Sequence, residues 1–148
     1  LEKKLMRLPA ATSKKVMRSA LMYALTPVVK TAKQLAPIDR IRSNLRKKSY
    51  INKKNNYRAE AGVVVRTIKR SQQKDRNEEI KDDPRNGWMW HFYEFGTDPR
   101  RQKTTGRYTG RIVAQPYIRP AFDMKRAEAL QRFKEALGRK IDQEARKK

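Results

Sequence analysis

Two stretches of the chain, one near each end, have the apolar spacing of an amphipathic helix. In the first, from Thr12 or Ser13 to Ala36, apolar residues recur at steps of three and four. We expect Thr12 or Ser13 to cap its start, and Pro37 to end it because the residue before a proline avoids the α region. Pro27 predicts a kink inside it. The predicted stripe is Val16, Ala20, Tyr23, Ala24, Val28, Thr31, Ala32 and Leu35.

The second predicted helix fills the C-terminal end of the chain. Pro120 is suited to its first position, where a missing backbone N–H costs nothing. Gly138 weakens the helix near its end. The predicted buried stripe is Phe122, Leu130, Phe133, Leu137 and Ile141, with Ala129 and Ala136 beside it.

The segment between the helices contains the predicted strands. Residues 57–67 read as a strand whose centre, 62–65, is apolar on both faces, as in a strand covered on both sides or at an interface. Residues 88–95 are aromatic and predict a strand or short helix, either packed on the core or at an oligomer interface. Residues 112–118 are extended in character. The order predicts an α+β fold, with two long helices packed on a small antiparallel sheet and with long basic loops or arms.

The chain length suits one domain. We interpret residues 1–148 as a single unit with one hydrophobic core. Residues 68–86 are mixed in charge and nearly free of large apolar side chains, and Pro84 and Gly87 mark their end. They predict an extended charged loop or arm that reaches a neighbouring subunit.

Positive charge is the strongest compositional signal. Lys and Arg number 38 against 15 acidic residues, which gives a net charge of +23. Such a chain repels itself unless a polyanion is near, so nucleic acid, an anionic membrane face or an acidic protein surface is expected as partner. We see no membrane-spanning apolar run and expect no signal peptide. The absence of cysteine excludes disulfides and thiolate metal sites and is consistent with the cytoplasm.

Two long runs without any acidic residue, 40–58 and 100–111, are the candidate contacts for such a partner. Their cations could neutralise phosphates without reading a base sequence, or dock on acidic neighbours, or form a solvated surface. Tyr50, Tyr57 and Tyr108 lie among them and could stack on bases or sugars. No motif of a sequence-specific DNA reader is present. The candidate cations are Arg40, Arg42, Arg46, Lys47, Lys48, Arg100, Arg101, Lys103, Arg107 and Arg111.

Catalytic chemistry finds little support in the sequence. The single histidine, His91, lies between Trp90 and Phe92, which is more typical of a packed core residue than of a catalytic base. The acids between 75 and 83 alternate with Lys and Arg, as on a solvated loop. No Walker loop, nucleophile elbow or HExxH motif occurs. We expect no enzyme, no cofactor and no metal site; a nuclease would depend on Glu60 or Glu94 near the predicted strands.

Three sequence blocks form a more specific pattern. They are AKQLAPID at 32–39, FYEFGT at 92–97 and AQPYIRPAFD at 114–123, which leads into the last helix. Their order and spacing resemble the tail-completion or head–tail joining family of lambda-like long-tailed phages, related to minor tail protein Z. The resemblance covers about residues 8–140, and the chain departs from it at Arg40-Ile41, where the family has Thr-Gly. The motif residues carried over are Glu94, Phe95, Gly96, Thr97, Gln115, Pro116, Arg119 and Pro120.

Physical reasons support these motif residues. Gly96 permits a tight backbone after the aromatic segment. Pro116 and Pro120 stiffen the path into the last helix. Arg119 is expected to pair with Glu94 and hold the two motifs together.

The resemblance implies structural work. Members of this family are found at or near the junction of the phage head and tail, form rings or line the DNA path, and need no cofactor. It implies as partners the connector or stopper, the tail terminator or tube, packaged double-stranded DNA and further copies of the chain, in a closed and, we expect, hexameric ring. The location is the virion, after assembly in the host cytoplasm. The rival hypothesis is a free, sequence-nonspecific nucleic-acid-binding protein of ribosomal or nucleoid type, which explains the charge but not the motif pair.

Overall fold

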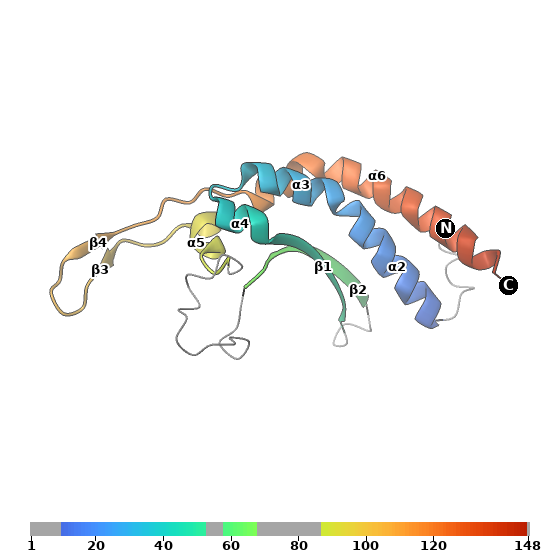
Figure 1. Ribbon diagram of the computed structural model, residues 1–148, viewed down its shortest axis with the longest axis horizontal. Coiled ribbons are helices and arrows are strands. Elements are labelled where there is room, and N and C mark those ends of the chain that lie inside the picture. The colour runs from blue at the N-terminus through green and yellow to red at the C-terminus, as the bar shows by residue number, and fades with distance from the viewer. Residues whose placement is uncertain (1–9, 53–57, 68–86, 148) are drawn as a thin grey trace.

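The computed structural model describes residues 10–52, 58–67 and 87–147. They form an elongated body of helices and a two-stranded sheet, with a narrow arm at one end (Figure 1). In chain order the elements are α2 (Ala10–Ala24), α3 (Thr26–Leu35), α4 (Asp39–Asn44), β1 (Leu45–Asn52), β2 (Arg58–Val65), α5 (Trp90–Phe95), β3 (Arg100–Arg101), β4 (Tyr108–Gly110) and α6 (Ile118–Ala145).

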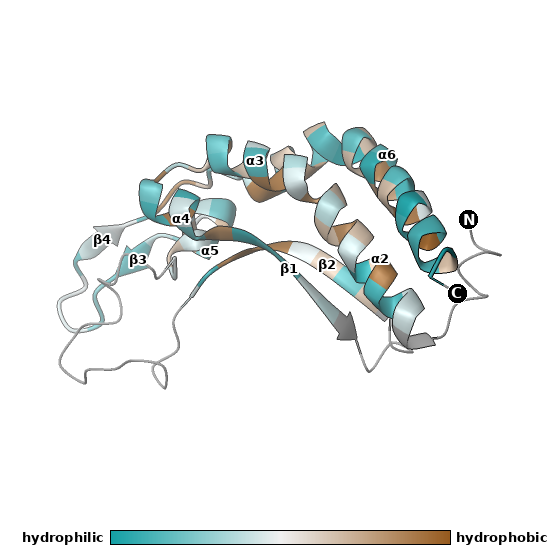
Figure 2. Ribbon diagram, turned by 45° about the vertical axis from the view of Figure 1, so that its right-hand side comes forward, coloured by the Kyte–Doolittle hydropathy of each residue, from teal (hydrophilic) through white to brown (hydrophobic). Residues whose placement is uncertain are grey.

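The predicted α+β class is confirmed, and the layers have a definite order. Helices α2 and α3 form the middle layer, with α6 packed along one side of them and the β1–β2 hairpin against the other (Figures 1 and 2). The outer surface of α6 is mostly hydrophilic (Figure 2). The predicted loop at 100–111 is instead a second antiparallel pair, β3–β4, which forms the arm.

The first predicted helix is divided where Pro27 predicts a kink. Helix α2 ends at Ala24 and α3 begins at Thr26, which places Pro27 in the first turn of α3, where its missing N–H is tolerated. The helix ends at Leu35, before Pro37, as expected. The predicted N-caps are wrong: Thr12 and Ser13 lie inside α2, which is already helical at Ala10.

The core is built largely from small side chains. Alanines between the helices let them approach closely, and the larger buried residues fill the space beside them. One cluster comprises Leu25, Val28, Ala32, Ala36, Ile41, Leu45, Tyr117, Ala121 and Ala129. The second cluster lies between α2 and the C-terminal half of α6, and it comprises Val16, Ala20, Ala136, Leu137 and Ile141.

Helix α6 differs from its prediction in its first half. Leu137 and Ile141 are buried as expected, and Phe133 packs against them. Phe122 and Leu130 are 47% and 54% exposed, so their placement in the buried stripe is wrong. The buried residues there are Ala121 and Ala129, of which Ala129 was expected beside the stripe. They share a core cluster with Ala32 of α3, as expected where closely packed helices favour small side chains. Pro120 is the third residue of the helix rather than the first, and Gly138 does not interrupt it.

The strand predicted at 57–67 is β2, and its partner β1 comes from the first basic run. The pair is antiparallel, with Leu45 opposite Val65 and Tyr50 opposite Glu60. Val63 and Val65 pack on the core, whereas Val64 points outward and is 36% exposed. The face of the sheet that bears Val63 and Val65 is therefore packed on the core, and the face that bears Val64 and Tyr50 is exposed.

Candidate functional site: the motif joint and the basic arm

Glu94 binds the start of α6. Its carboxylate is buried and accepts hydrogen bonds from the backbone N–H groups of Tyr117 (2.9 Å), Ile118 (3.0 Å) and Arg119 (3.1 Å). The first N–H groups of a helix have no partner inside it and carry the positive end of its dipole. Glu94 on α5 therefore supplies the cap of α6 from elsewhere in the chain, since Tyr117 at the N-cap provides no side-chain bond of its own.

Gly96 brings two extended segments together beside this cap. Its φ of +75° lies in the region that favours glycine, and an added Cβ would stand 3.1 Å from the Ala114 nitrogen and 3.2 Å from the Ile112 oxygen. The next residue uses this closeness. The Thr97 N–H donates to the Ile112 carbonyl (2.9 Å), and the Ile112 N–H donates to the Thr97 hydroxyl (2.9 Å).

These hydrogen bonds form what we call the motif joint: residues 93–97 bound to residues 112–119. The Gln115 N–H also donates to the Tyr93 carbonyl at 2.7 Å. Along residues 112–119, this bond lies between the one at Ile112 and those at the start of α6. The two blocks that distinguish the sequence are thus in direct contact. Gln115 and Pro116 take part through their backbone, with exposed side chains, and Phe95 is 73% exposed.

The expected ion pair between Glu94 and Arg119 is wrong. Glu94 contacts the backbone N–H of Arg119 rather than its guanidinium, which is exposed. Backbone amides satisfy a buried carboxylate without requiring a hydrated arginine head to lose its water. The joint is therefore a capping device and not a salt bridge.

Tyr117 is the largest fully buried side chain of the joint. Its exposed fraction is 0%, and its hydroxyl finds no hydrogen-bond partner within the described part of the chain. Burial, and to a smaller extent the negative charge of Glu94, raises the pKa of this phenol far above its usual value of 10.0. The ring therefore acts as a neutral core residue.

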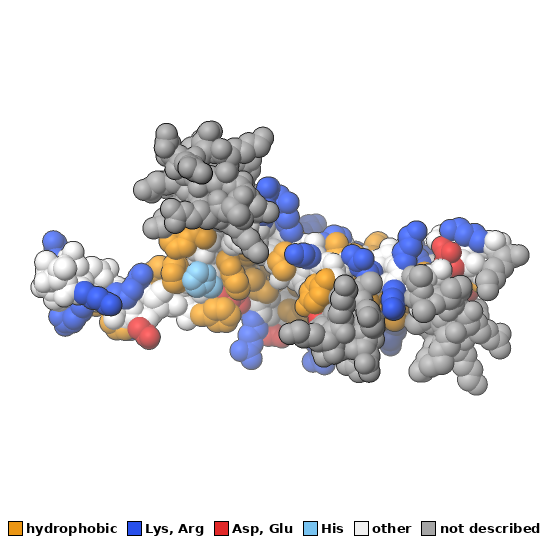
Figure 3. Space-filling view, turned by 90° about the horizontal axis from the view of Figure 1, so that it is seen from below, with side chains coloured by type: hydrophobic (Ala, Val, Ile, Leu, Met, Phe, Trp, Pro, Cys, Tyr) orange, Lys and Arg blue, Asp and Glu red, His pale blue; other side chains and the backbone are white. Residues whose placement is uncertain are grey.

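A shallow groove of about 650 Å³ lies beside the joint. It is lined by apolar side chains that include Phe95 and Val113, which are 73% and 64% exposed, and by the charged side chains of Asp98 and Arg111. Hydrophobic side chains gather around the histidine at this place (Figure 3). His91 is exposed there, against the rings of Trp90 and Phe92, so its interpretation as a packed core residue is wrong.

The basic arm, residues 100–110, projects away from the body (Figure 1). Every residue from 100 to 109 is exposed. The ribbon is closed by a turn around Gly106, whose φ is +65°, with the Gln102 N–H donating to the Arg107 carbonyl at 2.9 Å. At its base Arg100 lies over the Phe92 ring, 5.7 Å from the centroid. Five predicted cations lie on the arm or at its base: Arg100, Arg101, Lys103, Arg107 and Arg111.

The first basic run is dispersed by the fold. Arg42 is used internally: it pairs with Asp39 at 2.7 Å and donates to the carbonyls of Lys33 and Ala36. Lys47 faces the helices and donates to the Thr26 hydroxyl at 2.7 Å. The structure does not bring these residues together with the arm as one patch.

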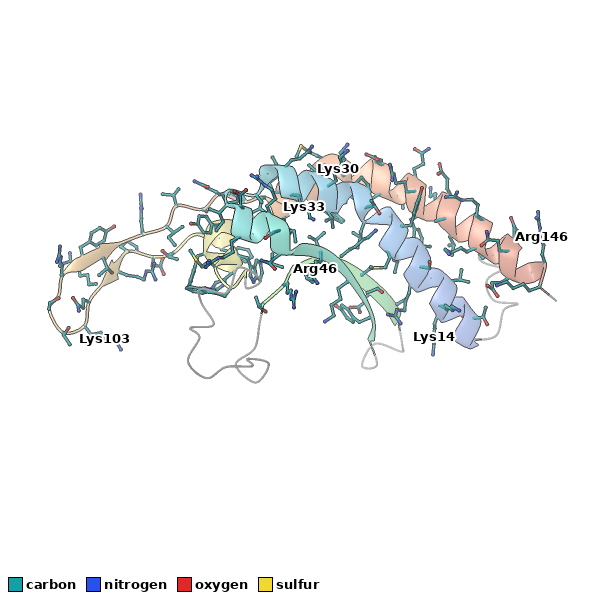
Figure 4. All side chains as sticks on the ribbon, viewed as in Figure 1. Lys14, Lys30, Lys33, Arg46, Lys103 and Arg146 are labelled. Carbon is teal, nitrogen blue, oxygen red and sulfur yellow. The ribbon has the colours of Figure 1, made fainter. Side chains whose placement is uncertain are left out.

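The remaining candidates of that run lie elsewhere. Arg46 and Lys48 are exposed on the uncovered sheet face, and Arg40 is half-buried on α4. Tyr50 shares that sheet face with Glu60, whose hydrogen bond and charge raise the pKa of the phenol. Cations are spread from end to end of the molecule, with Lys103 on the arm and Lys14 and Arg146 at the opposite end (Figure 4).

No group of His, Cys, Asp or Glu side chains in the described ranges is arranged to hold a metal ion. Within the same ranges, no helix is long and apolar enough to span a bilayer. The acids at 75–83, the segment 68–86 and Tyr57 lie outside the described residues. No protein-family model, curated protein or solved structure matches the chain.

The capping role of Glu94 was missed from the sequence. Its isolated position in an aromatic segment was the available signal, because a buried carboxylate requires donors. The pair of blocks predicted the contact, but the ion pair predicted for it, between Glu94 and Arg119, was wrong.

Proposed function

We propose that this protein is a non-enzymatic structural subunit of the head–tail junction of a long-tailed phage, assembled as a closed, hexameric ring near the DNA path. The observation that carries the proposal is the motif joint. The two blocks on which the resemblance rests, 92–97 and 114–123, are held against each other by backbone-directed bonds in this chain. A motif pair that makes one structural contact is a stronger basis for a family resemblance than either block alone.

The joint also explains why such a subunit needs these residues. The arm leaves the body after Thr97 and returns at Ile112, and these two residues are bonded to each other twice. The joint thus fixes the base of the arm and, through Glu94, the start of α6. A projection held rigidly on a helical body suits a subunit that reaches neighbours or the lumen of a ring.

The charge supports the same place in the particle. A net charge of +23 makes an isolated subunit repel its copies, so a ring of them gains from polyanionic or acidic neighbours. Packaged DNA, the connector or stopper, and the tail terminator or tube are the partners we propose. The exposed groove with Phe95 and Val113 offers an apolar contact for one of the protein partners.

A free, sequence-nonspecific nucleic-acid-binding protein is the competing function. It uses the same cations but does not account for the resemblance of the two sequence blocks. The two functions differ in whether particles need the chain.

The test is reconstitution of infectious particles. Phage genomes carrying a nonsense codon in this reading frame would be induced, and the lysates, which contain heads and tails, would receive purified protein. We expect infectivity to be lost without the chain and restored by its addition. Purified protein with Glu135→Gln, a change at an exposed position on α6, serves as a control and should restore infectivity as the wild-type protein does. Full infectivity without the chain would refute the proposal and leave the free nucleic-acid binder.

A further inference from the structure

We infer that the arm, residues 100–110, is the element that contacts the phosphate backbone of duplex DNA, without reading its sequence. This inference deepens the proposed function and rests on it for the identity of the polyanion. By composition alone, the two basic runs at 40–58 and 100–111 are equally good candidates for the DNA contact. The structure distinguishes them by shape, exposure and internal bonding.

The chemistry of the arm is uniform. Between Asp98 and Asp123 the chain has no acidic residue. Every residue from 100 to 109, apart from the turn glycine, is Arg, Lys, Gln, Thr or Tyr, and all ten are exposed. These are the side chains that donate hydrogen bonds to phosphate oxygens in protein–DNA complexes. The ribbon therefore presents donors along its length.

The charge of the arm has no structural use within the described chain. No residue of the arm belongs to either core cluster. Among the described residues its cations form no ion pair, and their internal interactions are the Arg100 stack on Phe92 and a 3.3 Å bond from Arg101 to the Gly106 carbonyl. By contrast, Arg42 and Lys47 of the first run are bonded to the body. The cations of the arm remain available to a partner.

The shape of the arm suits a DNA groove. Two paired strands lie about 4.8 Å apart, and a two-stranded ribbon fits the major groove of B-DNA, which is roughly 12 Å wide. The strands pair Arg101 with Tyr108, which places both side chains on one face of the ribbon. Lys103 lies near the tip, the part farthest from the body (Figure 4).

Composition favours DNA over an acidic protein as the partner. Protein interfaces are anchored by apolar or aromatic side chains that become buried at their centre. Residues 100–110 contain one aromatic side chain, Tyr108, and no aliphatic one larger than threonine. The apolar side chains lie at the groove beside the base instead. Phosphate binding needs no apolar anchor, because its free energy comes largely from counterion release.

The test measures how binding to a short duplex of random sequence, followed by fluorescence anisotropy, depends on salt. One variant neutralises the arm with Arg101→Gln, Lys103→Gln and Arg107→Gln. A matched variant removes the same charge from exposed helix positions with no described ion pair, through Lys30→Gln, Arg126→Gln and Lys134→Gln. Both variants should unfold at the wild-type midpoint, since neither touches the core.

We expect the slope of log affinity against log salt to fall by about 0.9 for each phosphate that the variant no longer neutralises, approaching ~2.7 for the arm variant. The control variant should keep the wild-type slope. Equal slopes for the two variants would overturn the inference. So would a poly-glutamate competitor that displaces the wild-type protein as well as duplex DNA does, because that result identifies an acidic protein surface as the partner.

If the arm variant keeps the wild-type slope but the wild-type chain restores infectivity, the arm does not contact DNA and the proposed neck function still stands. If the slope is reduced but particles are infectious without the chain, the arm binds DNA and the proposed neck function is refuted.

Discussion

Replacing Glu94 should destabilise the fold more than replacing an exposed carboxylate residue does. The Glu94 side chain is 7% exposed and accepts three backbone N–H bonds at the start of α6. A hydrogen bond to a charged group contributes about 1.5–3 kcal/mol, and three bonds that share one carboxylate are not additive. We therefore expect Glu94→Ala to lower the free energy of unfolding by about 3–5 kcal/mol.

Glu94→Gln gives an intermediate case that keeps the reasoning testable if the alanine variant does not fold. The amide oxygen can replace Oε2, which binds the N–H groups of Tyr117 and Ile118. The amide nitrogen would then face the Arg119 N–H, donor against donor, and the favourable charge at the helix start is removed. We expect stability to fall by about 2 kcal/mol.

The assay is urea unfolding followed by far-ultraviolet circular dichroism, in the absence of DNA. Glu135→Ala is the control, since Glu135 is exposed on α6 and accepts one bond from Gln131. It should change stability by less than about 0.5 kcal/mol. A Glu94→Ala protein as stable as that control would refute the capping role.

Two other positions in the joint make separate predictions. Gly96→Ala should cost about 1–3 kcal/mol, because its φ of +75° and the close Ala114 and Ile112 atoms both oppose a Cβ; Gly106→Ala, with open space around it, should cost less in the same urea experiment. Tyr117→Phe should raise stability by about 1 kcal/mol, since it removes a buried hydroxyl with no described partner. Because the raised pKa of Tyr117 keeps the folded phenol neutral, wild-type stability should fall as pH rises above the unfolded value of 10.0. The phenylalanine variant should lose less over that range, and an equal loss in both proteins would contradict this reasoning.

The regular elements were the predictable part of the fold, because their signals are local. Helical spacing and two prolines were enough to place α2, the break before α3 and the end at Leu35. The β-branched, apolar centre at 62–65 located β2 to within two residues at each end. The buried stripe of α6 was predicted correctly in its second half. In its first half, periodicity alone favoured the large residues Phe122 and Leu130, which are exposed, whereas Ala121 is buried.

The candidate site could be predicted only as a contact between two blocks. The chemistry of that contact depends on which donors become buried, and the sequence offered Arg119 as the obvious partner of Glu94. Tertiary structure instead directs backbone N–H groups at the carboxylate. The arm was missed as a hairpin because its strands are very short and carry almost no apolar alternation to reveal them.

We would test the proposed ring subunit at the head–tail junction by cryo-electron microscopy, focused on the neck, of virions of the phage that we propose carries this protein. We expect a closed, hexameric ring whose density fits α2, α3 and α6 and whose arms reach DNA density. A complete neck structure without density for this chain would contradict it.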